Sequence, residues 1–182
     1  MNALVRRVVT ALCLGLLAGS MVAGCGIAAS TEAPQATPTL ALPSYSPAIA
    51  ETRRQVVAAL ATSSLQLQDA TQPFRPPESP TVTAAVRGVF QVILPADPSH
   101  GYIVVYEFRD QSSAASAGAE LASYLGTGPG RIQFTPDTQH LIRLVGTTLV
   151  TYSWSPANST DTRSDPIPAD LNTLGTAIAV PS

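Results

Sequence analysis

Hydrophobic residues form one long apolar run near the N-terminus and several shorter patterned segments after residue 45. The run covers 8–22 and follows Arg6 and Arg7. Residues 26–45 are rich in Ala, Thr, Pro and Ser, carry a single charged residue and show no apolar periodicity. Such a composition is typical of a tether. The pattern therefore divides the chain into a leader, a tether and a folded body.

Helical spacing of apolar residues predicts three helices in the body. They cover 47–69, the segment from Asp110 to Gly126, and the segment from Asp165 to Pro181. Each begins at a Ser or Asp that can cap the helix, and the first and third have proline at the first helical position. Gly126 stands where a left-handed C-cap residue is favoured.

Alternating or continuous apolar runs predict five strands. They cover 86–94, 102–109, 131–135, 139–145 and 148–154. A seven-residue loop joins the first two as a hairpin, with Tyr102 and Tyr106 on its core face. Gly146-Thr147 predicts a type II′ turn that pairs Val145 with Thr148 and Leu141 with Tyr152. The four-proline stretch 73–80 suits neither a helix nor an inner strand.

The order of predicted elements is helix, two strands, helix, three strands, helix. Hairpin connections favour a mainly antiparallel sheet. We therefore expect residues 46–182 to form a single α+β domain with a five-stranded sheet and helices largely on one face.

The leader has the layout of a secretory signal peptide, with a basic start, an apolar run and small residues at its end. The 15-residue run is shorter than the roughly 20 residues that a helix needs to cross a bilayer. It ends in Val22-Ala23-Gly24-Cys25, which resembles the lipobox of bacterial lipoproteins. The resemblance implies that 1–24 are removed and that Cys25 receives a diacylglycerol, leaving 25–45 as a lipidated tether.

Lipidation would hold the mature chain on a membrane, because two or three acyl chains anchor a protein stably whereas one is marginal. We therefore expect a bacterial lipoprotein on the extracytoplasmic side of the cell membrane, with the membrane as its partner through Cys25. By analogy, Gly26 favours the outer membrane in a host with two membranes. The alternatives are a transmembrane anchor and a secreted protein with an unused cysteine.

Charge and cysteine content narrow the classes of function. The chain has ten basic residues, all arginine, twelve acidic residues and a mean hydropathy of +0.20. Without the leader the formal charge is −4, which disfavours nucleic acid as a partner. Cys13 and Cys25 are the only cysteines, so the mature fold has no thiol for a disulfide, a metal or catalysis. We predict no metal site and no cofactor.

Candidate catalytic residues are few. The sequence has no Gly-x-Ser-x-Gly elbow, no His-Glu-x-x-His motif and no lysine for a phosphate loop. A Ser/His/Asp triad would need His100 or His140, which we interpret as surface and strand-edge residues. Arg75 is interpreted as a solvated or capping arginine rather than a ligand contact. We predict no catalytic residue, with an envelope hydrolase as the alternative.

Four aromatic residues fall on predicted strands: Tyr102, Tyr106, Tyr152 and Trp154. Amphipathic aromatics at a sheet end or open face commonly anchor sugars, peptides or proteins. The four either form such a binding surface or complete the core. The body also resembles uncharacterised bacterial lipoproteins, which implies no particular activity. We expect a non-catalytic module that binds an envelope protein or a small ligand, with a structural or assembly role as the alternative.

Overall fold

The computed structural model describes residues 44–182. The lipobox, Cys25 and the tether up to residue 43 lie outside the described residues. Within 44–182, no helix is long and apolar enough to cross a bilayer. The elements are α1 (Pro47–Ala61), β1 (Leu67–Asp69), α2 (Pro80–Thr83), β2 (Val86–Val92), β3 (Tyr102–Glu107), α3 (Gln111–Gly126), the 3-10 turn η1 (Arg131–Gln133), β4 (Gln139–Val145), β5 (Thr148–Trp154), the 3-10 turn η2 (Thr162–Ser164), α4 (Ile167–Leu171) and β6 (Thr176–Ile178).

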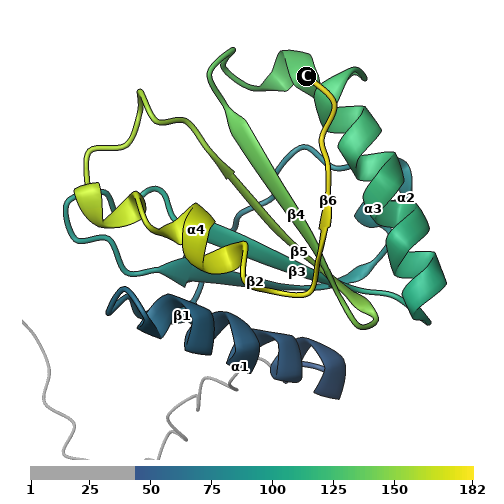
Figure 1. The fold of residues 1–182 in the computed structure, drawn as a ribbon, viewed down its shortest axis with the longest axis horizontal. Coiled ribbons are helices and arrows are strands. Elements are labelled where there is room, and N and C mark those ends of the chain that lie inside the picture. The colour runs from purple at the N-terminus through teal and green to yellow at the C-terminus, as the bar shows by residue number, and fades with distance from the viewer. Residues whose placement is uncertain (1–43) are drawn as a thin grey trace, which may run out of the picture. The chain divides into compact units, whose positions relative to one another are not determined.

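The strands form one antiparallel sheet in the order β1-β2-β3-β5-β4-β6 (Figure 1). The α+β class and the antiparallel sheet are confirmed, but the predicted count of five strands is wrong. The segment 131–135 contains a 3-10 turn in place of a strand, because its N–H groups bond locally, from Gln133 to Gly130 and from Phe134 to Arg131, and Ile132 is 86% exposed. Two three-residue edge strands, β1 and β6, were too short to show an alternating pattern.

Helices cover both faces of the sheet, which corrects the prediction that they lie largely on one. One core joins α1 and α4 to the sheet face that contains Ile103, Val105 and Tyr152. A second core joins α2 and α3 to the opposite face, which contains Val104 and Tyr106 (Figure 1). A strand buried on both faces reads as a continuous apolar run rather than an alternating one. The run Ile-Val-Val-Tyr in β3 is such a case.

Local signals predicted several features correctly. Ser46 caps α1 and accepts a hydrogen bond from the Ile49 N–H, and Asp110 caps α3 through the Ser113 N–H. The β4–β5 hairpin has the predicted register, from Val145–Thr148 to Leu141–Tyr152. Gly146 has a φ of 59°, as the first central residue of a type II′ turn requires.

Helix α1 ends at Ala61, well before the predicted end at residue 69. Ser64 adopts a left-handed φ of 58°, and the Leu65 N–H donates to the Leu60 carbonyl. Glycine usually occupies the left-handed position of this helix-ending arrangement. Because serine occupies this position, the sequence does not show where the helix ends. Leu67 of β1 also continues the helical spacing of apolar residues.

The C-terminal segment is also not the predicted long helix. α4 ends at Leu171, and the chain then turns at Gly175, whose φ is 34°. It continues as β6 along the edge of β4. Leu174 belongs to the core under α1 and α4, whereas Ile178 packs against the core under α3. The segment therefore passes from one face of the sheet to the other at this edge.

Candidate functional site

The structure does not bring the four predicted aromatic residues together. Tyr106 is in the core under α3, and Tyr102 lies on the same side, stacked on Phe74 with ring centroids 4.1 Å apart. Tyr152 and Trp154 belong to the opposite side, where their rings stack at 5.2 Å. The aromatics form two pairs on two faces and not one continuous surface.

Tyr106 and Tyr152 are buried and fill the two cores. Tyr106 is 1% exposed, and its hydroxyl donates to Glu78 Oε1 at 2.8 Å. Burial raises the pKa of Tyr106, and the neighbouring Glu78 charge raises it further. Burial likewise raises the pKa of Tyr152. Tyr102 and Trp154 are the half-buried members of the set.

Glu78, in the proline-rich segment before α2, is the buried centre of an ionic cluster. Its side chain is only 2% exposed. Oε1 accepts from Arg87 Nη1 at 2.8 Å as well as from Tyr106, and Oε2 accepts from Arg75 Nε at 2.9 Å. A buried carboxylate needs such charged donors to offset its desolvation. The cluster therefore fixes both guanidinium groups beside β2.

An open groove of about 710 Å³ lies next to this cluster, and we call it the β2-edge groove. Its wall includes Tyr45, Asp69 to Arg75, Arg87 and Val89. It exists because β1 pairs with only the last three residues of β2, so that the edge of 86–88 has no neighbouring strand within the described chain. The residues after β1 then turn away towards Phe74 and border the groove.

Tyr45 closes the groove on the side of α1. Its ring packs against Phe90 at 5.1 Å, and its hydroxyl donates to Asp69 Oδ1 at 3.3 Å. Burial and the Asp69 charge raise the pKa of Tyr45. The predicted tether included Tyr45, but the structure shows that the folded body contains it.

A second cavity of about 610 Å³ lies between the end of α3, the start of β4 and the C-terminal segment. His140 lines it and is half-buried, and its ring forms a T-shaped pair with Phe134 in which the ring centroids are 4.7 Å apart. Nδ1 lies 2.8 Å from Ser153 Oγ. Burial lowers the pKa of His140, which favours the neutral ring. No carboxylate within the described residues contacts the ring to orient it as in a triad.

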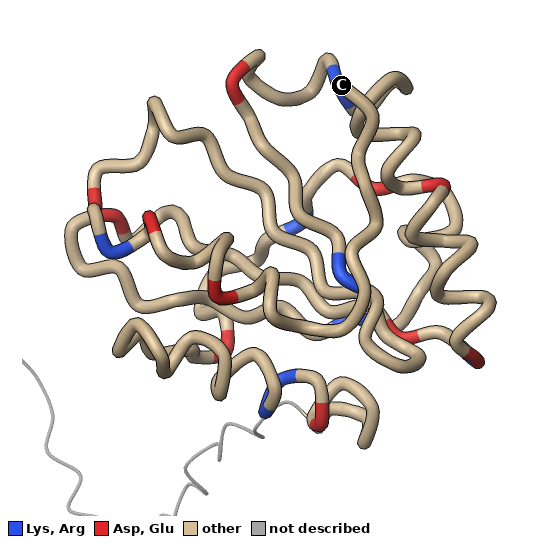
Figure 2. The backbone as a smooth tube through the Cα atoms, in the orientation of Figure 1, with Lys and Arg blue, Asp and Glu red and all other residues tan. Residues whose placement is uncertain are grey.

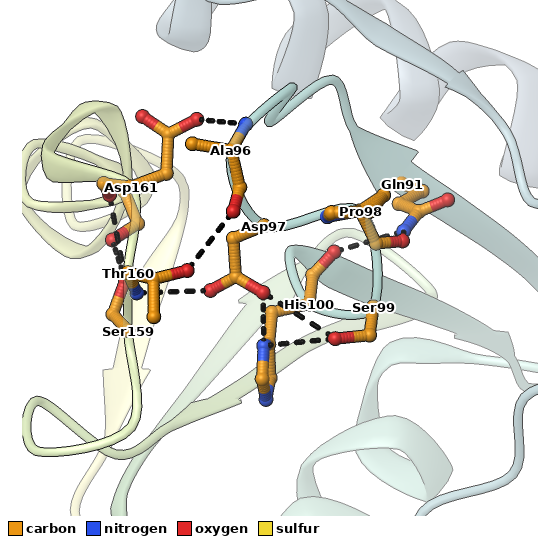
Figure 3. A network of polar contacts seen from close by, with 10 residues as sticks. Gln91, Ala96, Asp97, Pro98, Ser99, His100, Ser159, Thr160 and Asp161 are labelled. Atoms are coloured by element: carbon orange, nitrogen blue, oxygen red, sulfur yellow. Dashed lines mark hydrogen bonds and ion pairs between the residues drawn. The ribbon is translucent and has the colours of Figure 1, made fainter.

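The loop after β2 holds His100, in the arrangement shown in Figure 3. Nδ1 lies 2.5 Å from Asp97 Oδ1 and 3.3 Å from Ser99 Oγ. Burial raises the pKa of Asp97, but hydrogen bonds from His100 and the Thr160 N–H outweigh it, so the net shift is downward. A triad needs the acid and the nucleophile at opposite ring nitrogens. Here both contact Nδ1, so the geometry does not suit activation of Ser99, and Asp97 instead accepts from the Thr160 N–H of the segment after β5.

The same loop is joined to the segment after β5. Asp161 Oδ2 accepts from the Ala96 N–H at 3.1 Å, and Thr160 Oγ1 donates to the Ala96 carbonyl at 3.0 Å. Arg163 donates to Asp161 and lowers the pKa of that carboxyl to about 2. Asp161 and Asp97, which accepts from the Thr160 N–H, therefore join the loop after β2 to the segment after β5.

Residues 44–182 contain no group of three His, Cys, Asp or Glu side chains that could hold a metal ion. Charged residues are sparse and scattered over this part of the chain (Figure 2). The clusters at Glu78 and at Asp97–Asp161 gather several of them.

Sequence reasoning missed the β2-edge groove. Arg75 is interpreted from the sequence as a solvated or capping arginine, and it is indeed exposed and donates to the Thr83 carbonyl at the end of α2, but no sequence signal marks Phe74, Glu78 or Arg87. The spacing of Arg75 and Glu78 suggests a local ion pair, but nothing local indicates that Arg87 and Tyr106 meet the same carboxylate. Comparisons with protein-family models, curated proteins and solved structures gave no match to this chain.

Proposed function

We propose that this chain is a lipoprotein of the bacterial cell envelope, anchored through Cys25 on the extracytoplasmic side of the membrane, whose body binds a ligand without transforming it. The basic start, the apolar run and the lipobox support the anchor. The ligand site is the β2-edge groove.

One observation carries the binding role: the groove places the ring of Phe74 beside two arginines in a space of about 710 Å³. Ligand sites are concave, have volumes of roughly 300–1,000 Å³, and combine apolar walls with a few placed polar groups. The groove has this combination. The cavity beside His140 has a similar volume, but it is lined by one arginine, Arg131, where the groove is lined by two.

Fragment binding tests this proposal. The ¹⁵N-labelled full chain in neutral detergent would be titrated with uncharged single-ring compounds, such as benzyl alcohol and methyl glucoside, and followed by NMR. We expect amide shifts at Tyr45, Phe74 and Val89, because these residues border the groove. Replacing Phe74 with Ala should weaken binding, whereas the matched change Phe134→Ala in the other cavity should not.

Shifts confined to the cavity beside His140 would contradict the assignment of the groove. Binding that is unchanged in Phe74→Ala would contradict it as well. The amide spectra of the wild type and the variant should agree far from the groove, for example at the β4–β5 turn. Such agreement shows that the variant keeps the wild-type structure.

A further inference from the structure

The β2-edge groove has a positive wall in an acidic body. Residues 44–182 contain eight arginines and eleven acidic residues, yet Arg75 and Arg87 both line the groove and Asp69 is its only acidic lining residue. Asp69 is already engaged, since its Oδ1 accepts from Tyr45 and lies 3.6 Å from Arg53 Nε. The local excess of positive charge is therefore carried by Arg75 and Arg87.

Both arginines keep unused donors. A guanidinium has five N–H groups. Arg87 uses Nη1 on Glu78, and Arg75 uses Nε on Glu78 and Nη2 on the Thr83 carbonyl. The side chain of Arg75 is 53% exposed, and no nitrogen of Arg87 is both buried and unpaired. The remaining N–H groups can therefore reach a bound molecule.

Glu78 positions Arg75 and Arg87 without neutralising their combined charge. One buried carboxylate holds two guanidinium groups, so the three charges sum to +1. Because Glu78 is also fixed by the Tyr106 hydroxyl, the donors are oriented before a ligand arrives. Donors held in place lose less side-chain freedom on binding. The net charge matches one oxyanion, and guanidinium N–H groups suit carboxylate and phosphate oxygens.

Phe74 adds an apolar platform beside the charge. Its ring is parallel to that of Tyr102, with an interplanar angle of 4°, and it also lines the groove together with Tyr45. A flat ring on the ligand can stack on such a platform. The groove thus offers an anion site and a ring site next to each other.

We propose that the groove binds a small molecule in which a carboxylate or phosphate is attached to a flat, apolar ring, with Arg75 and Arg87 on the oxyanion and Phe74 on the ring. This inference rests on the proposed function, because it names the ligand class of the same groove.

The experiment compares ring compounds that differ in charge. The full chain in neutral detergent would be titrated with benzoate, phenyl phosphate, benzyl alcohol and benzylamine, and with inorganic phosphate alone, by NMR. We expect at least one ring anion to bind about tenfold more tightly than benzyl alcohol, and benzylamine to bind more weakly. Benzoate against phenyl phosphate distinguishes the carboxylate from the phosphate. Inorganic phosphate alone should bind more weakly than phenyl phosphate, because it lacks the ring.

Arginine variants locate the effect. Arg75→Gln and Arg87→Gln should each remove most of the preference for the anion, while Arg131→Gln, an arginine lining the other cavity, should leave it unchanged. Arg75 is the more exposed of the pair, so its variant keeps the test valid if loss of Arg87 disturbs Glu78. Thermal unfolding of each variant verifies that it is folded.

The outcomes separate the two proposals. If the uncharged ring binds in the groove as tightly as the anions, the ligand class is wrong while the groove remains a binding site. Anion binding that persists in both groove variants would also overturn the inference. If none of the ring compounds shifts Tyr45, Phe74 or Val89, the proposed function itself fails.

Discussion

At the scale of single residues, Asp161 links stability to pH. Its pKa falls from 3.8 in an ordinary carboxyl to about 2, chiefly through Arg163, with the Ala96 N–H as a further donor. A pKa that is lower in the folded than in the unfolded state stabilises the fold above the unfolded value. That stability is lost as the pH falls from 3.8 towards about 2.

We therefore predict that Asp161→Asn flattens the acid side of the stability curve. Urea unfolding between about pH 5 and about pH 2 would measure the free energy of unfolding. The wild type should lose more of it on acidification than the variant does. Asp165→Asn, an exposed aspartate in the same segment, is the control. Equal pH slopes in the wild type and Asp161→Asn would refute the prediction.

Tyr106 gives a second prediction at this scale. Tyr106→Phe removes a donor from the buried Glu78 carboxylate, so we expect a loss of about 1 kcal/mol or somewhat more, because hydrogen bonds to charged groups exceed the neutral average. Tyr152→Phe is the matched control, since the Tyr152 hydroxyl has no hydrogen bond to the described residues. Chemical denaturation measures both variants. Equal losses of unfolding free energy in the two variants would show that the hydrogen bond from Tyr106 to Glu78 does not stabilise the fold.

Residue-level signals predict what is local. The caps Ser46 and Asp110 and the turn at Gly146 depend on neighbours within four residues, so the sequence reveals them. The Tyr106–Glu78 bond joins residues 28 apart. Such a contact depends on how a proline-rich segment lies across a sheet, which no spacing rule describes.

At the scale of elements, the packing of the C-terminal segment on α3 depends on Gly126. The sequence predicts a left-handed C-cap at this glycine, but it is the last residue of α3, Thr127 is the C-cap, and the φ of Gly126 is not positive. A Cβ at this position would collide with the backbone of Pro181. The glycine is needed for close approach of two segments rather than for its own conformation.

Gly126→Ala should therefore destabilise the protein by about 1–3 kcal/mol, as overpacking commonly does. The same substitution in a chain shortened by residues 180–182 should be neutral or stabilising, because alanine is the better helix former by about 1 kcal/mol. Thermal or urea unfolding would be measured for the wild type, the shortened chain, and the Gly126→Ala variant of each. A loss that is equal in both backgrounds would mean that Pro181 is not the obstacle.

Elements with strong periodicity were predictable and edge elements were not. β3 and β5 bury most of their residues, and α3 and β4 bury regularly placed apolar residues, so their patterns can be recognised in the sequence. β6 is three residues long and largely exposed. It pairs with β4, and the turn that leads into it is held by Arg143, a buried arginine of β4 that donates to the carbonyls of Leu174 and Gly175. That support comes from more than 30 residues away in sequence.

At the scale of the whole molecule, the β2-edge groove combines parts that no single segment contains. Tyr45, the turn after β1, the proline-rich segment and β2 all contribute to its wall. The α+β class could be predicted because it depends on the order of elements. The groove could not, because it depends on how far β1 extends along β2.

The proposed lipid anchor is the central claim at this scale, since it would determine where the groove meets a ligand. Cys25 would be the only cysteine left if the predicted leader is removed, so a single substitution tests the anchor. Two or three acyl chains hold a protein on a membrane stably, whereas the acidic body adds no attraction to anionic lipid.

The most direct measurement is detergent phase partition of the protein expressed in a bacterial host, with Cys25→Ala beside the wild type and Cys13→Ala as the matched control. We predict that the wild type and Cys13→Ala enter the detergent phase and incorporate a labelled fatty acid. Cys25→Ala should carry no label and should not separate with the membrane lipids once its leader is removed. If mature Cys25→Ala still enters the detergent phase, or the wild type carries no lipid, the account is contradicted.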